Sequence, residues 1–338
     1  MLTDTPILEI DAVSKRFVTE LDIAERTARL LGSKVEPLTV HAVDGVRLSV
    51  RKGEVLGLVG ESGCGKSTLG RMVAGLMPPS EGQIRFRGRD VAALRGAEAR
   101  EAALKIQMVF QDPMSSLNPR LRVDEIVGEA PRVHGIVSRR EQDGYVDDLL
   151  NRVGLDPTTR KRYPHQFSGG QRARIGIARA LAVKPDFIVC DESVAALDVS
   201  IQAQILNLFM RLREELDLTY LFISHDLGVV EHISDRIAVM YLGRLVELGA
   251  AEDVLRRPNH PYTQALVAEI PTFETKKKAF NPIKGEIPSP LKPPTGCHFH
   301  PRCPHAHQRC IVERPALKEI APGRLSACHL NDEARAAA

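Results

Sequence analysis

The chain has 338 residues, of which 43% are hydrophobic and 26% are charged, and its formal net charge at pH 7 is +3. These values are typical of a globular protein long enough for two domains. The small charge gives no indication of a nucleic-acid partner. No run of about 18 apolar residues is present and no basic, apolar leader opens the chain, so we expect neither a membrane-spanning helix nor a secreted protein.

The first 255 residues carry alternating strand and helix signals. The charged stretch 19–39 is predicted to be an insertion between two strand-like segments. Apolar runs at 55–59, 187–190 and 220–223 fit strands that are buried on both faces. From Ile201 to Leu216, apolar side chains recur at helical spacing and predict one amphipathic helix. This alternation indicates an α/β fold with a mainly parallel sheet.

Composition changes after Arg257, because 12 of the 22 prolines and six of the 11 histidines lie beyond it. Such a stretch favours loops over long helices or strands. We therefore predict a first domain at residues 1–255 and a small, loop-rich second module at residues 256–338.

A glycine-rich segment directly follows the run 55–59 and precedes a helix-compatible stretch from Thr68 to Leu76. It matches the pattern G-x-x-x-x-G-K-[ST] with the residues Gly60, Glu61, Ser62, Gly63, Cys64, Gly65, Lys66 and Ser67. Glycines let the backbone N–H groups turn inward as an anion nest, and the helix start adds a partial positive charge. We predict that this segment and Thr68 bind a nucleoside triphosphate, with Lys66 on the β- and γ-phosphates and the Ser67 hydroxyl on Mg²⁺. An ordinary glycine-rich turn is the alternative.

Two acids follow the run 187–190, at the strand end where open α/β sheets bind ligands. Asp191 is predicted to hold Mg²⁺ through water, and Glu192 to be the base that polarises the attacking water. The alternative is a helix N-cap made by Asp191, with Glu192 in the first turn. His225 follows the run 220–223 and falls at the same edge. A lone histidine there is more often structural, but together with the other motifs it is predicted to contact the γ-phosphate.

The segment Phe167-Ser-Gly-Gly-Gln171 resembles the signature motif of ATP-binding-cassette ATPases. Other motifs of that family fall in order along the chain. Gln111 resembles the Q-loop glutamine, Asp198 the D-loop aspartate and His225 the switch histidine. Phe17 aligns with the aromatic residue that stacks on adenine.

This resemblance implies a P-loop ATP-binding-cassette fold with a mainly parallel RecA-like sheet, an antiparallel β subdomain, a helical subdomain and a small loop-rich C-terminal module. It also implies a dimer, in which the signature motif serves the ATP of the opposite subunit. Residues expected to act on ATP in trans are Ser168, Gly169, Gly170, Gln171 and Asp198. Gln111 would join the Mg²⁺ ligands Ser67 and Asp191, and would complete the catalytic set with Glu192 and His225.

Four further segments resemble the peptide and nickel importer branch of the family, at residues 41–45, 111–119, 164–170 and 261–266. The resemblance implies an ATP-hydrolysing subunit on the cytoplasmic face of a bacterial inner membrane, which energises import of di- and oligopeptides. Its expected partners are two transmembrane permease subunits, a second ATPase subunit that is a copy or a paralogue, and an extracytoplasmic substrate-binding protein. Nickel, glutathione or another small cargo, export, and a soluble ATPase without membrane partners are the alternatives.

Four cysteines cluster in the C-terminal module, as in the C-terminal extension of oligopeptide-importer ATPases. They are Cys297, Cys303, Cys310 and Cys328. Four thiolates can bind either a [4Fe–4S] cluster or tetrahedral zinc. A metal would stabilise a module too small to build much apolar core. We predict a structural [4Fe–4S] cluster, with zinc or reduced structural cysteines as the alternatives.

Overall fold

The computed structural model describes residues 6–20, 37–270 and 285–332. The predicted insertion 19–39 therefore lies mostly outside the described residues. The strands on either side of it, β1 and β2, end at Val18 and begin at Thr39.

Strands near the N-terminus form a four-stranded antiparallel sheet in the order β2-β1-β4-β5. Its members are β1 (Pro6–Val18), β2 (Thr39–Arg51), β4 (Glu81–Phe86) and β5 (Arg89–Asp90). In the second half of β2, Val46, Leu48 and Val50 are buried while the residues between them are exposed. Alternation with a period of two places one face of this sheet against the core. The antiparallel β subdomain expected from the sequence is thus present.

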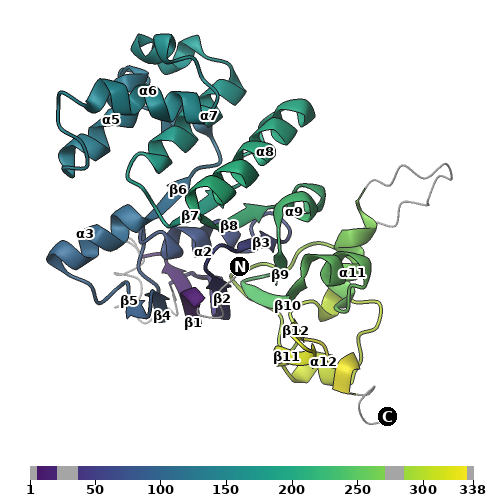
Figure 1. The fold of residues 1–338 in the computed structure, drawn as a ribbon. Coiled ribbons are helices and arrows are strands. Elements are labelled where there is room, and N and C mark those ends of the chain that lie inside the picture. Colours follow the sequence, from purple (N-terminus) through teal and green to yellow (C-terminus); the bar gives the residue numbers. More distant parts are fainter. Residues whose placement is uncertain (1–5, 21–36, 271–284, 333–338) are drawn as a thin grey trace, which may run out of the picture.

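An eight-stranded sheet in the order β11-β12-β10-β9-β3-β8-β7-β6 forms the centre of the molecule (Figure 1). Its members are β3 (Val55–Val59), β6 (Ile106–Val109), β7 (Phe187–Asp191), β8 (Thr219–Ser224), β9 (Arg236–Tyr241), β10 (Arg244–Ala250), β11 (Lys318–Ala321) and β12 (Arg324–Ser326). Strands β9, β3, β8, β7 and β6 are parallel, and the other three join antiparallel at one edge. The three apolar runs predicted as buried strands are confirmed as β3, β7 and β8, in which every residue is buried.

Helices pack on one face of this sheet, and α2 (Lys66–Val73) together with the four-stranded sheet packs on the other. Strand β3 therefore contributes Val55 and Val59 to one apolar core and Leu56 and Leu58 to another. The described helices are α2 (Lys66–Val73), α3 (Gly96–Lys105), α4 (Pro113–Ser116), α5 (Val123–Val133), α6 (Gln142–Arg152), α7 (Gly169–Leu181), α8 (Val199–Leu216), α9 (Leu227–Ile233), α10 (Ala251–Arg256), α11 (Pro261–Ala268) and α12 (Gln308–Val312). The predicted amphipathic helix is α8. Helices α5, α6 and α7 gather beyond the sheet as a helical subdomain (Figure 1). None of the described helices is long and apolar enough to cross a bilayer.

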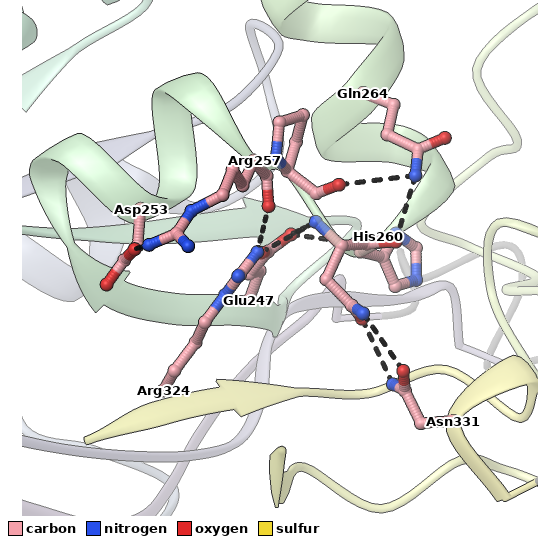
Figure 2. A network of polar contacts seen from close by, with 9 residues as sticks. Glu247, Asp253, Arg257, His260, Gln264, Arg324 and Asn331 are labelled. Atoms are coloured by element: carbon pink, nitrogen blue, oxygen red, sulfur yellow. Dashed lines mark hydrogen bonds and ion pairs between the residues drawn. The ribbon is translucent and has the colours of Figure 1, made fainter. Parts of the chain in front are cut away.

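The C-terminal module is joined to the edge of the central sheet, because β12 pairs with β10. Beside this pairing, the fully buried carboxylate of Glu247 accepts hydrogen bonds from the backbone N–H groups of Asn259 and His260. It also accepts one from Arg324 at 3.0 Å (Figure 2). Asn259 and Asn331 exchange two further hydrogen bonds. The module was predicted to be loop-rich, but two of its segments, β11 and β12, extend the main sheet.

Candidate nucleotide-binding site

The loop after β3 turns sharply because its glycines adopt positive φ, +151° at Gly60 and +105° at Gly65. A Cβ atom at Gly60 would lie 2.1 Å from the carbonyl oxygen of Met240, and one at Gly65 would lie 2.1 Å from that of Ala42. Only glycine fits at such distances. Gly65 is also the N-cap of α2, so the free N–H groups of that helix start at the end of the loop.

Lys66 is buried, and its ammonium lies across the loop that precedes it. Its Nζ atom donates hydrogen bonds to the carbonyl oxygens of Gly60 at 2.7 Å and Glu61 at 3.0 Å. Its third contact is with the sulfur of Cys64, at 3.9 Å. An ammonium held by neutral groups can exchange them for anionic oxygens, which make stronger hydrogen bonds. Ser62 and Gly63 are exposed at the loop tip, whereas Thr68 is half-buried in α2.

Cys64 lies within this loop, where its backbone N–H donates a 3.3 Å hydrogen bond to the carbonyl oxygen of Glu61. It is buried, and burial raises the pKa of its thiol, which therefore stays protonated at neutral pH. The motif leaves this position unspecified, which agrees with a buried, protonated side chain there.

Ser67 and Asp191 bring the start of α2 to the end of β7. The Ser67 hydroxyl donates a 2.7 Å hydrogen bond to Oδ1 of Asp191, which is 2% exposed. Burial raises the pKa of Asp191, while the hydrogen bond from Ser67 and the charge of Arg71 oppose that rise. A hydroxyl and a carboxylate at this spacing are oxygen donors of the kind that Mg²⁺ prefers.

Glu192 is at the centre of a second polar cluster, beside Asp191. Its Oε2 atom accepts a 2.9 Å hydrogen bond from Nε2 of Gln111 and lies 3.3 Å from Nδ1 of His225. Glu192 has a φ of +45°, a backbone conformation that costs energy for a residue other than glycine and is frequent at functional sites. The three residues follow β6, β7 and β8, which are neighbours in the sheet, so their carboxyl ends meet at one edge.

The alternative interpretation of the acid pair, a helix N-cap at Asp191, is wrong. No helix starts at Glu192; the next one, α8, begins at Val199 with Asp198 as its N-cap. Residues 192–197 form turns instead. The acids are therefore held by the strand end and by their polar partners, not by a helix.

The segment 168–171 opens α7. Oγ of Ser168 accepts a hydrogen bond from the N–H of Gln171, and Oε1 of Gln171 accepts one from the N–H of Ser168, which is a capping box. Ser168, Gly169 and Gln171 are exposed, as is Asp198. Among the described residues, neither 168–171 nor Asp198 forms a hydrogen bond to the loop 60–68.

Phe17 lies on β1 and is 41% exposed. The ammonium of Lys15 lies 5.4 Å from the ring centroid. An exposed aromatic face near the end of a strand is able to stack on a planar ligand. Phe17 is thus accessible to a ligand. Among the contacts of the described residues, none joins Phe17 to another predicted site residue.

Comparisons with known proteins agree with this fold and geometry. Residues 43–195 match the ABC transporter family, and residues 246–310 match the oligopeptide/dipeptide transporter C-terminal region. The chain is 51% identical over 328 residues to the oligopeptide transport ATP-binding protein AppF of Bacillus subtilis, covering 96% of this chain and 97% of AppF. This chain belongs to the ABC transporter ATPase family. The match at residues 246–310 places it in the oligopeptide/dipeptide branch.

Solved ABC ATPases have the same fold. The cbiO1 protein of Clostridium perfringens, part of an ABC transporter complex, is 26% identical with a TM-score of 0.61, over 75% of this chain and 92% of cbiO1. The cassette MJ0796, solved as a dimer in a post-hydrolysis state with ADP and Pi, is 27% identical with a TM-score of 0.61, over 72% of this chain and 98% of MJ0796. The predicted ATP-binding-cassette fold is therefore confirmed.

In this ABC ATPase the four cysteines of the C-terminal module line one small cavity, together with His260, His300, His305 and His329. Burial and the other three thiols raise the pKa of Cys328 to about 11. However, no group of three or more Cys, His, Asp or Glu side chains within the described ranges is arranged to hold a metal ion. The donor set suits a metal centre, but the side-chain positions do not form one.

Two residues of the C-terminal region contact the glycine-rich loop of this ABC ATPase and were not predicted. The backbone N–H of Glu61 donates to the hydroxyl of Tyr262 at 2.8 Å. The carboxylate of Glu61 accepts hydrogen bonds from both terminal nitrogens of Arg302, at 2.7 and 2.9 Å. Tyr262 lies in the segment 261–266, and Arg302 directly precedes Cys303. No local pattern links either residue to position 61.

Proposed function

We propose that this chain is the ATP-hydrolysing subunit of a bacterial inner-membrane importer of di- and oligopeptides. The observation that carries the proposal is the meeting of Gln111, Glu192 and His225 at one sheet edge, beside the Ser67–Asp191 pair. Membership of the oligopeptide/dipeptide branch supports peptides as the cargo.

The proposed nucleotide site uses the loop that follows β3. The N–H groups of residues 60–68 and the ammonium of Lys66 would bind the triphosphate, and Phe17 would stack on adenine. Ser67, Asp191 and Gln111 would hold Mg²⁺, which neutralises charge on the phosphates when bound. Glu192 accepts a proton from the attacking water, and His225 contacts the γ-phosphate.

We further propose that two ATPase subunits act together, the second being a copy of this chain or a paralogue. Exposure of the capping box at 168–171 and of Asp198 leaves both able to contact ATP on a partner. MJ0796 was solved as a dimer. In this proposal residues 1–255 form the ATPase domain and 256–338 its extension. The pair lies on the cytoplasmic face of the membrane and contacts two permease subunits. An extracytoplasmic substrate-binding protein delivers the cargo to these permeases.

Transport assays in cells test the cargo. Labelled di- and oligopeptides are offered to cells whose only copy of this subunit is wild type or Glu192→Gln, and both proteins are quantified by immunoblot. We expect the variant to abolish peptide uptake while an unrelated uptake system is unaffected. Equal peptide uptake in both strains would overturn the proposed cargo, and the same strains would then be compared for nickel and glutathione uptake.

We also propose that the four cysteines bind a [4Fe–4S] cluster that stabilises the module, with zinc as the alternative. Support comes from their shared cavity and from the four-thiol donor set. The side-chain arrangement described above does not match a metal centre, so metal analysis of the purified protein is the test of this proposal. Anaerobic purification is expected to give iron and sulfide in stoichiometric amounts. Zinc without iron would establish the alternative. If neither metal is found, the cysteines are reduced and hold no metal.

A further inference from the structure

The ion pair between Arg302 and Glu61 joins two segments separated by 241 residues. Arg302 lies in the cysteine module, and Glu61 is the second residue of the glycine-rich loop. The Arg302 side chain is only 4% exposed, whereas that of Glu61 is 22% exposed. Two parallel N–H···O bonds fix the carboxylate in one orientation, as is usual for arginine paired with a carboxylate.

The loop has a second connection to the same region, through aromatic packing. The hydroxyl of Tyr262 accepts the hydrogen bond from the N–H of Glu61. The Tyr262 ring lies 4.6 Å from that of Tyr241 and 5.4 Å from that of Phe299, measured between ring centroids. All three rings are fully buried. The partners of Glu61 are therefore held by a packed cluster, and a loose surface contact is excluded.

A carboxylate at position 61 is unfavourable for a loop that binds a triphosphate. Like charges within several ångströms repel, and the repulsion is strong where water is partly excluded. Lys66 donates to the carbonyl oxygen of the same residue, so Glu61 belongs to the wall of the cradle itself. The positive charge of Arg302 neutralises the negative charge of the Glu61 carboxylate, and its two hydrogen bonds hold that carboxylate in place.

We propose that Arg302 is a positioning residue for ATP binding. It neutralises and orients Glu61, so that the cysteine module determines how well the phosphate loop accepts the triphosphate. Because Arg302 directly precedes Cys303, a rearrangement of the cysteine-lined cavity would reach the loop through it. The inference rests on the proposed assignment of residues 60–68 as the phosphate cradle.

A double-mutant cycle on the full-length chain tests this. The Kd of a non-hydrolysable ATP analogue with Mg²⁺ is measured by calorimetry for wild type, Arg302→Met, Glu61→Gln and the double variant. We expect Arg302→Met to raise Kd about fivefold at low salt and less at high salt, because an unpaired carboxylate repels the phosphates and salt screens it. The double variant should return to within about twofold of wild type, because both charges are gone.

Arg324→Met is the matched control, since it breaks a second arginine–glutamate pair between module and core, the one with Glu247. It should lower the melting temperature but leave Kd and its salt dependence unchanged. An unchanged Kd in Arg302→Met, or a rise that Glu61→Gln does not rescue and salt does not alter, would overturn the inference. If Arg302→Met does not fold, Arg302→Gln takes its place in the cycle.

Two measurements made before the cycle distinguish a failure of the proposed nucleotide site from a failure of the positioning role. Wild type should bind the analogue and Lys66→Ala should not. If wild type does not bind, the proposed nucleotide site fails. If both results hold, the cradle stands and the Arg302 variants test the positioning role alone.

Discussion

The side-chain amide of Gln111 donates a hydrogen bond to the carboxylate of Glu192 across 81 residues of sequence. The two residues follow β6 and β7, which pair in parallel, so adjacent strand ends bring them together. Gln111 thereby orients the carboxylate proposed as the catalytic base. Orientation of such a group matters because proton transfer requires hydrogen-bond distance to the water that it activates.

Glu192→Gln is expected to abolish ATP hydrolysis while ATP binding survives. An amide keeps the size of the side chain but does not accept the proton, and loss of a general base costs about 10²- to 10⁴-fold in rate. The check is phosphate release together with size-exclusion chromatography in ATP, where the variant should accumulate as a dimer. A variant that hydrolyses at the wild-type rate would place the base elsewhere.

Gly65→Ala is expected to disrupt the loop far more than Gly63→Ala. Both glycines have positive φ, so each substitution costs roughly 1 kcal/mol from backbone strain. At Gly65 the new methyl group would also lie 2.1 Å from a backbone oxygen, whereas nothing lies within 4 Å of a Cβ at Gly63. Melting temperature and nucleotide affinity should both fall further for Gly65→Ala. Equal losses would show that φ alone sets the cost.

Ser168→Ala is expected to impair hydrolysis with little effect on nucleotide binding by one subunit. It removes the N-cap of α7 and exposes a free N–H, at a cost of about 1 kcal/mol. The segment makes no described hydrogen bond to the loop 60–68, so the effect should appear only where two subunits meet. Binding is measured at low protein concentration and hydrolysis at high concentration. A loss of binding at low concentration would argue against action in trans.

His260 is expected to make stability depend on pH. Burial lowers its pKa to about 4, and its Nδ1 atom accepts a hydrogen bond from the N–H of Tyr262, as only the neutral ring can. The unfolded chain therefore binds more protons, and stability rises with pH. From about pH 7 to about pH 5, this residue should cost the folded state about 2 kcal/mol.

The variant His260→Asn separates this effect from that of other groups, because asparagine also caps a helix but does not titrate. Its unfolding free energy, measured by urea titration at both pH values, should fall less on acidification than that of wild type. His298, whose pKa burial also lowers to about 4, stays in both proteins. Identical losses would show that His260 does not contribute.

Much of the fold and of the candidate site could be predicted from short stretches of sequence. The run 55–59, the glycine-rich loop and the helix after it are adjacent in the chain, so residue type and spacing alone indicate a phosphate cradle. The apolar stripe of α8 likewise follows from helical periodicity. Glu192 and His225 were expected to meet because the strand ends of a parallel sheet share one edge, whereas Gln111 was added to them through its resemblance to the Q-loop glutamine.

The sequence by itself determined the elements whose causes are local: glycine conformations, buried runs and the acids at a strand end. Only the tertiary structure decided that the C-terminal hairpin extends the ATPase sheet through β12 and β10, and that Arg302 pairs with Glu61. The physical reason is the sequence distance over which each kind of interaction acts. Backbone preference and periodicity act over a few residues, whereas an ion pair across 241 residues depends on how two separately formed segments pack, which no local pattern records.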